Sequence, residues 1–241
     1  MTLRNFFILA AVALLPALAA AAPADKNSQD LAPLLGGFVQ SDRWLINKDK
    51  YQEEFIGRVR YSNDNISLKA QRALSDRLNK IYTLKGNVFA SYKLPQNATA
   101  EVRADKIVYN QKKDLGLITS AAQKQAQAVY KTEDNTFKAY ADKIDFGQKF
   151  SSFTLSGWAQ FEDDNNTLYA KEISYDAQSG VIQARGARPL ILGFGDEGDY
   201  ALQADFITAN IYKGGFEARG RVRGWFVSAQ DISDFTKGQI K

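Results

Sequence analysis

The residues that could carry out chemistry in this chain are few, and most lie in sequence contexts typical of turns. The adjacent carboxylate pairs are Asp163/Asp164 and Asp196/Glu197, each followed by Asn or Gly. Hydrolysis by paired carboxylates needs two groups placed across a cleft rather than side by side in the chain. Solvated turns are therefore the favoured interpretation of both pairs, ahead of acid/base dyads or calcium ligands.

Two further motifs match catalytic or phosphate-binding sequences only in part. The segment GFGDEG (193–198) has the glycines of a phosphate-binding loop, but no helical pattern follows it. Ser156 lies in LSGW, which is not a nucleophile elbow. We expect a loop between strands at the first position and a surface strand residue at the second.

Composition removes whole classes of chemistry. The 241-residue chain contains no Cys and no His. Disulfides, thiolate nucleophiles, Cys-ligated zinc and histidine bases or ligands are thus excluded. We expect no enzymatic activity, no cofactor and no metal site. The formal net charge of +4 is too small to indicate nucleic acid as a partner.

A series of cations near the C-terminus is the remaining candidate for ligand contact. Arg219, Arg221 and Arg223 alternate with small or apolar residues. In a regular strand they would therefore share one face. A solvated face of a terminal strand is the simplest interpretation, and contact with lipid phosphates or sugar acids is the functional alternative.

The N-terminus is typical of a secretory signal peptide. Arg4 precedes the apolar run 6–15, and Pro16 and an alanine-rich stretch follow. We expect a signal peptide over residues 1–21, cleaved between residues 19 and 21, and export to the periplasm. A retained membrane anchor is the alternative, because residues 6–22 carry no charge and reach the short limit of a bilayer-spanning helix.

The rest of the chain divides into a lead segment, one repetitive domain and a tail. Residues 22–52 mix polar and apolar stretches without sustained periodicity. Residues 53–232 consist of short runs that alternate apolar and polar side chains, separated by turn residues. Residues 233–241 form the C-terminal tail.

The alternating runs predict an all-β class. A first strand is expected at residues 44–46, within the lead segment. Helical character is present only around residues 69–78 and 121–129, where Ala, Leu, Gln and charged residues cluster.

An internal repeat is the most informative feature of the sequence. Its pattern is an apolar residue, Ala two positions later, a polar residue, then Ile and an aromatic residue at alternate positions. The copies are VRADKIVY (102–109), AYADKIDF (139–146), LYAKEISY (168–175), the less perfect LQADFITA (202–209) and the degenerate LKAQRALS (68–75). Sixteen residues after the motif alanine comes Gly86, Gly157, Gly186 or Gly220, but the copy with Ala104 has Ser120 there.

The spacing within the motif predicts bent strands. The motif alanine and isoleucine are three residues apart and would face opposite sides of a regular strand. A β-bulge or sharp bend at the step after the alanine brings both inside. Each unit is then a bent hairpin, and stacked units form an elongated, open, twisted sheet. Its interior is expected to run along Leu68, Val102, Ile107, Ile144, Leu155, Ile173, Leu202, Ile207 and Val222.

These tandem units resemble the LptA/OstA-like periplasmic proteins of lipopolysaccharide export. The likeness extends over about residues 53–231 and is clearest at TLKGNVFAS (83–91) and EVRADKIVYNQKKD (101–114). The resemblance implies an open β-jelly roll that carries lipid A acyl chains in an apolar trough, here lined by the nine interior residues. It also implies that such jelly rolls join end to end and bridge the inner and outer membranes.

The resemblance implies lipopolysaccharide or a related glycolipid as the ligand, and transport components of both membranes with jelly-roll domains as partners. Head-to-tail homo-oligomers are also expected, since a stack of hairpins leaves unpaired backbone groups at both ends. Three alternatives remain: the membrane-anchored partner of the same system, a secreted structural or adhesive β-protein with a closed core, and a glycan-acting enzyme without an identifiable site. Alternating apolar residues suit a lipid trough and a packed core equally well.

Overall fold

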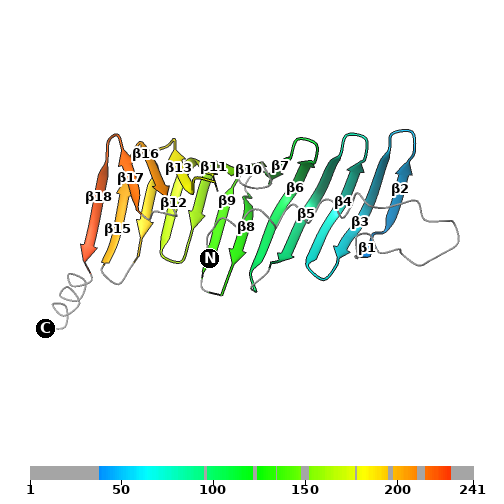
Figure 1. The fold of residues 1–241 in the computed structure, drawn as a ribbon, viewed down its shortest axis with the longest axis horizontal. Coiled ribbons are helices and arrows are strands. Elements are labelled where there is room, and N and C mark those ends of the chain that lie inside the picture. The colour runs from blue at the N-terminus through cyan, green and yellow to red at the C-terminus, as the bar shows by residue number, and fades with distance from the viewer. Residues whose placement is uncertain are drawn as a thin grey trace.

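The computed structural model is one antiparallel sheet of 18 strands. It describes residues 38–94, 97–121, 124–133, 135–147, 152–176, 178–194, 198–210 and 215–228. The expected signal peptide (1–21) and C-terminal tail (233–241) lie outside the described residues. Figure 1 shows the strands stacked along the long axis of the molecule, from β2 at one end to β18 at the other.

The strands differ in length, and the longest have 11 to 13 residues. In chain order they are β1 (Phe38–Gln40), β2 (Arg43–Asn47), β3 (Gln52–Ser62), β4 (Ile66–Asp76), β5 (Ile81–Lys93), β6 (Thr99–Asn110), β7 (Leu115–Thr119), β8 (Ala126–Lys131), β9 (Thr136–Ala141), β10 (Lys143–Gly147), β11 (Ser152–Glu162), β12 (Asn166–Asp176), β13 (Val181–Arg185), β14 (Leu190–Gly193), β15 (Gly198–Gln203), β16 (Phe206–Asn210), β17 (Phe216–Arg219) and β18 (Arg223–Ser228).

Hydrogen-bond pairing divides the sheet lengthwise into two halves, which we call legs. The first leg has the order β1-β3-β4-β5-β6-β8-β9-β11-β12-β14-β15-β18. The second leg has the order β2-β3-β4-β5-β6-β7-β10-β11-β12-β13-β16-β17. The six long strands run through both legs, and we call the place where each passes from one leg to the other a corner.

The corners lie at the repeated motifs. In β12 the side chains of Ala170 and Ile173 are both buried, while Lys171 and Glu172 between them are not. The pairing with β11 shifts at the same place, because Gly157 and Trp158 together lie opposite Lys171 alone. Equivalent shifts occur in the β3–β4, β4–β5 and β5–β6 pairs. The bent hairpins predicted from the spacing are confirmed, with the extra residue on the glycine-bearing strand.

Gly157 shows why glycine recurs at a corner. Its φ is +75°, a conformation that only glycine adopts without strain. A Cβ at this position would also lie 2.3 Å from Oδ2 of Asp142. The close approach arises because the backbone N–H of Asp142 donates to the Gly157 carbonyl at 3.2 Å. Both the backbone conformation and the space therefore require a residue without a side chain.

Most of the interior is one apolar cluster that includes residues from Val39 to Ile207 and from both legs. A second, smaller cluster contains Leu94, Ala98, Ala100 and Tyr130. Aromatic rings fill the larger cluster where the backbone leaves room. Tyr109 and Phe146 lie on either side of Gly116 in neighbouring strands, and their rings stack with centroids 6.1 Å apart. Gly116 permits this contact because a Cβ there would overlap the Phe146 ring.

A charged pair lies beside the apolar residues near the N-terminal end of the sheet. Glu53 is 5% exposed and forms an ion pair with Arg77. Burial raises the pKa of the Glu53 carboxyl above its ordinary value, against a smaller lowering by the charge of Arg77. Desolvation of the carboxylate therefore outweighs its attraction to the guanidinium.

Two helical expectations are wrong. Residues 69–76 belong to β4, and residues 126–129 belong to β8. Both segments pair with strands on two sides. The ladder hydrogen bonds and burial of alternate side chains outweigh the helix propensity of Ala, Leu and Gln. The strand expected at residues 44–46 lies within β2, and β1 precedes it in the lead segment.

The corner geometry predicts that Gly157→Ala is more destabilising than Gly215→Ala. Both glycines have positive φ, +75° and +80°, but nothing lies within 4 Å of a Cβ at Gly215. Gly215→Ala should therefore lower the free energy of unfolding only by the conformational strain, about 1 to 2 kcal/mol. Gly157→Ala should lower the free energy of urea unfolding further, and Asp142→Ala should recover part of the difference. Equal costs for the two glycine substitutions would contradict this account.

The raised pKa of Glu53 predicts a pH-dependent effect of Glu53→Gln. A raised carboxyl pKa means that the folded state binds the proton more tightly, so this group adds stability as pH falls through its folded pKa. Glu53→Gln should remove that gain. Urea unfolding at a series of pH values from neutral down to the ordinary carboxyl range should show wild type approaching or overtaking the variant as pH falls. A difference in unfolding free energy between wild type and Glu53→Gln that does not change with pH would exclude the mechanism.

Candidate functional site

Most of the nine residues predicted to line the interior are buried in it. Those with exposed fractions below 9% are Leu68, Ile107, Ile144, Leu155, Ile173 and Ile207. Val102 and Leu202 are partly buried and pack against the same cluster. These eight residues come from seven strands in both legs, so the interior forms one continuous apolar strip along the sheet.

Val222 does not share this burial, and its assignment to the interior is wrong. It is 50% exposed and lies between β17 and β18. Val59 and Val88 follow their corner glycines by the same two residues and are only 1% and 2% exposed. Those two are covered by the next hairpin, whereas no described strand lies beyond β17 and β18.

The three arginines near the C-terminus do not share a face. Gly220, with φ +70°, forms a corner between them, so Arg219 lies in the second leg and Arg223 begins β18 in the first. Arg219 donates from Nε to Oε1 of Glu217 at 2.7 Å. The alternation inferred for one strand therefore breaks at the corner.

Arg221 is held by a carboxylate of the preceding repeat. Its Nη2 and Nε donate to Asp205 at 2.8 and 3.1 Å, and this contact holds the pKa of the Asp205 carboxyl below its ordinary value. Asp42 and Arg58 form the same pair at the opposite end of the sheet, with Nη2 of Arg58 2.7 Å from Oδ1 of Asp42. In both cases the arginine follows the aspartate by sixteen residues, a spacing that sequence inspection could have detected.

Both ends of the sheet expose apolar side chains on edge strands. At the N-terminal end these are Phe38, Trp44, Leu45 and Ile46, and at the C-terminal end Phe216, Trp225, Phe226 and Val227. Edge strands carry unpaired backbone donors and acceptors. Exposed apolar residues next to such groups are typical of surfaces that pair with another chain.

The carboxylate pair at Asp163 and Asp164 caps hairpins. Oδ1 of Asp163 accepts the backbone N–H groups of Asn165 and Asn166 at 2.9 and 2.7 Å. Asp164 accepts the backbone N–H of Thr136. Asp196 and Glu197 lie outside the described residues. In the part of the chain that the structure describes, no cluster of three metal-ligating side chains occurs, and no helix has the length and hydropathy to cross a membrane.

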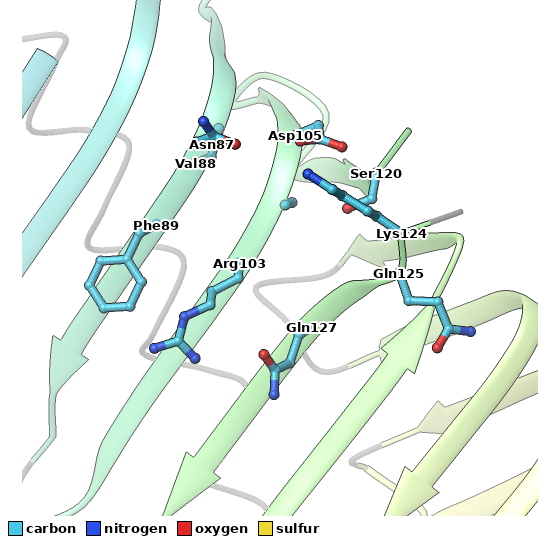
Figure 2. A pocket seen from close by; sticks show the side chains of 10 residues that line it. Asn87, Val88, Phe89, Arg103, Asp105, Ser120, Lys124, Gln125 and Gln127 are labelled. Atoms are coloured by element: carbon cyan, nitrogen blue, oxygen red, sulfur yellow. The ribbon is translucent and has the colours of Figure 1, made fainter. Parts of the chain in front are cut away.

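Two cavities on the outer face were not predicted from the sequence. The first, of about 260 Å³, lies at the corner where Ser120 replaces the repeated glycine. Figure 2 shows the Lys124 side chain extending toward Asp105 and the Arg103 side chain beside Gln127. The Asp105 carboxylate accepts the backbone N–H of Ala121 at 2.7 Å. The second cavity, of about 450 Å³, surrounds Trp158.

Comparison with known proteins agrees with the repeat pattern. The family model described as LptA/(LptD N-terminal domain) LPS transport protein matches residues 76–181. No curated protein sequence gives a significant match. A solved structure, that of LptH, the LptA homologous periplasmic component of the lipopolysaccharide transport device from Pseudomonas aeruginosa, is 15% identical with a TM-score of 0.33. The alignment covers 63% of this chain and 82% of LptH.

The matched segment runs from the end of β4 to the start of β13. It therefore includes both motif segments on which the resemblance was based, at 83–91 and 101–114. The resemblance inferred from the repeats is therefore confirmed over residues 76–181, where this chain is similar to the LptA/(LptD N-terminal domain) family of LPS transport proteins.

Proposed function

We propose that this chain is a periplasmic transport module that holds the acyl chains of lipopolysaccharide, or of a related glycolipid, between its two legs. The observation that carries the proposal is the continuous apolar interior, which extends from Val39 to Ile207 through both legs. A ligand that moves along a protein needs such an uninterrupted apolar path. The family match at residues 76–181 supports the same role.

The connection between the legs favours an interior that can open. The described strand pairs lie within one leg or the other, and the legs are joined through the long strands at the corners. Moving the legs apart would therefore break no ladder hydrogen bond. Separation of the legs would lose the free energy of contact between buried side chains. Burial of each methylene of an entering acyl chain would contribute about 0.8 kcal/mol of stabilisation.

A closed-core structural protein is the second candidate. Leu68 and Ile173 have exposed fractions of 0%, so these inward side chains are packed closely against other residues of the chain. The two candidates differ in whether these contacts separate when a glycolipid is present.

Photo-crosslinking from single positions should separate the two candidates. A photoreactive side chain at Ile107, Ile144 or Ile173, which are buried in the interior, should capture lipopolysaccharide in cells. Matched positions on the outer face are Lys106, Lys143 and Glu172, each adjacent in sequence to one of the three, and these should not. Capture from neither set would favour the closed-core protein, and capture from both would indicate nonspecific association.

We further propose that the ends of the sheet join other jelly rolls, including further copies of this chain, to form a bridge between membranes. The exposed edge strands support this, because β2 presents Leu45 at one end and β18 presents Phe226 at the other. Pairing β18 or β17 of one copy with β1 or β2 of the next would continue both the ladder and the apolar interior. Because the two ends differ, the contact is head to tail.

A charge on either edge should prevent this assembly. Leu45→Glu or Phe226→Glu would place a carboxylate in the new contact, and burying it without a partner is costly. Sedimentation velocity over a range of concentrations should show oligomers for wild type and monomers for either variant. Leu78→Glu is the control, since Leu78 is exposed in a hairpin away from both edges. Wild type that stays monomeric at all concentrations would exclude the proposal.

A further inference from the structure

A row of amide and aromatic side chains, with one leucine among them, crosses the outer face of the first leg. Cross-strand pairing places its members side by side on six neighbouring strands. The strands from β8 to β15 that carry it are stacked along the long axis of the molecule (Figure 1). In order, its residues are Gln127, Tyr140, Gln160, Tyr169, Leu190 and Gln203. None of them is acidic.

The cavity of about 450 Å³ lies on this row, close to the corner. It is lined by four members of the row together with corner residues that include Trp158, Arg188 and Gln125. No lining residue is acidic. Tyr169 is 38% exposed and Trp158 is 76% exposed, so aromatic surface is accessible at the cavity.

Trp158 has a costly backbone conformation without a compensating gain in burial. Its φ is +45°, which is strained for a residue with a large side chain. Other corners have Arg58 or Asn87 at the equivalent place after the glycine. The amide of Gln125 donates to the Trp158 carbonyl at 2.7 Å and holds this conformation. Packing does not explain an exposed indole here, whereas contact with a ligand does.

Arg188 provides a second, independent feature of the same cavity. It ends a run of three residues with positive φ, Gly186, Ala187 and Arg188, immediately before the buried Pro189. Its Nη2 is 3.5 Å from the carbonyl oxygen of Arg221. Its Nε is buried and has no hydrogen-bond partner within the described part of the chain. A buried cationic donor without an acceptor favours an incoming anion.

The carboxylate whose pKa the Arg188 charge lowers already has another partner. Asp205 accepts hydrogen bonds from Nε and Nη2 of Arg221. Asp205 is close enough for the Arg188 charge to contribute to its lowered pKa, after the larger effect of Arg221. The guanidinium of Arg188 thus remains available to a ligand in the cavity.

We propose that this cavity binds an acidic saccharide. The C–H face of a pyranose ring packs against Trp158 or Tyr169, because an aromatic face attracts polarised C–H groups. The side-chain amides of Gln160 and Gln203 both donate and accept, which suits sugar hydroxyls. The guanidinium of Arg188 binds the carboxylate or phosphate of the sugar.

The repeat of the row fits an extended glycan. Adjacent strands are about 4.8 Å apart, close to the length that one pyranose adds to an extended chain. Successive sugars can therefore meet successive side chains from Gln127 to Gln203. Single-stranded nucleic acid also stacks on aromatic rings, but it requires a groove of cations along its backbone. Arg188 is the single cation in the lining of this cavity, which favours a saccharide with sparse charge.

Calorimetric titration of the full chain with tetragalacturonate tests the site. We expect saturable binding that weakens with salt, with weaker binding of neutral galactotetraose and none of inorganic phosphate. Trp158→Gly and Arg188→Asn should each lower the affinity about tenfold or more. Trp158→Gly also relieves the positive φ, so unfolding would not account for its loss of binding.

Matched controls come from positions with the same backbone conformation. Tyr51→Gly removes an exposed aromatic side chain with φ +52° far from the row, and Arg58→Asn removes an arginine with φ +44° already paired with Asp42. Both should bind like wild type. Absence of binding to tetragalacturonate, unchanged affinity in both site variants, or equal binding of an oligothymidylate would overturn the proposal.

The source of the sugar is distinguished by two further ligands. A phosphorylated core oligosaccharide released from lipopolysaccharide and free of acyl chains should compete if the source is the glycolipid. Glycan strands that contain muramic acid should compete if the source is the cell wall. Ile107, Ile144 and Ile173 are not among the residues that line this cavity. The result of the saccharide titration is therefore independent of whether acyl chains are captured at Ile107, Ile144 or Ile173.

Discussion

The corner bulge is the constraint on which the rest of this structure depends. A regular strand would turn Ala170 and Ile173 to opposite faces. The pair of positive-φ residues at Gly157 and Trp158, opposite the single residue Lys171, returns both to the interior. A glycine with positive φ recurs at the corners of Gly57, Gly86, Gly186 and Gly220. The sheet therefore folds along one line and encloses a single apolar strip.

This arrangement separates the two faces of the sheet by function. Inward positions must remain apolar and closely packed, since a polar group such as Glu53 is tolerated there only with a partner like Arg77. Outward positions are free of that requirement. The residue after each corner glycine can thus be Arg58 at one corner and Trp158 at another. The first gives an ion pair with Asp42, and the second gives an exposed aromatic surface beside a cavity.

The two ends of the sheet are similar in chemistry although they come from opposite ends of the chain. Each has an aspartate–arginine pair at its last corner, Asp42–Arg58 and Asp205–Arg221. These pairs are exposed, so they contribute little to stability. Their position suggests that they orient the terminal hairpins, where one neighbouring strand is missing. Apolar edge residues beside them make the ends suited to addition of a further sheet.

The sequence alone was sufficient for the features that repeat locally. The three-residue step from Ala170 to Ile173 and the sixteen-residue interval from Ala141 to Gly157 predicted bent hairpins, because the period of a strand relates spacing directly to side-chain direction. Six buried interior residues and the family resemblance followed from that pattern. Local propensity was misleading at residues 121–129, where pairing with two strands outweighs helix preference.

Only the tertiary structure decided what depends on distant neighbours. Val222 has the pattern of an interior residue, but it is exposed because no described hairpin covers the last corner. Arg188 and Trp158 are 30 residues apart in the chain and meet at one cavity through the registers of β11, β12 and β14. The proximity of these two residues cannot be predicted from their spacing in the sequence. Pairing between strands sets it, and pairing is a property of the whole sheet.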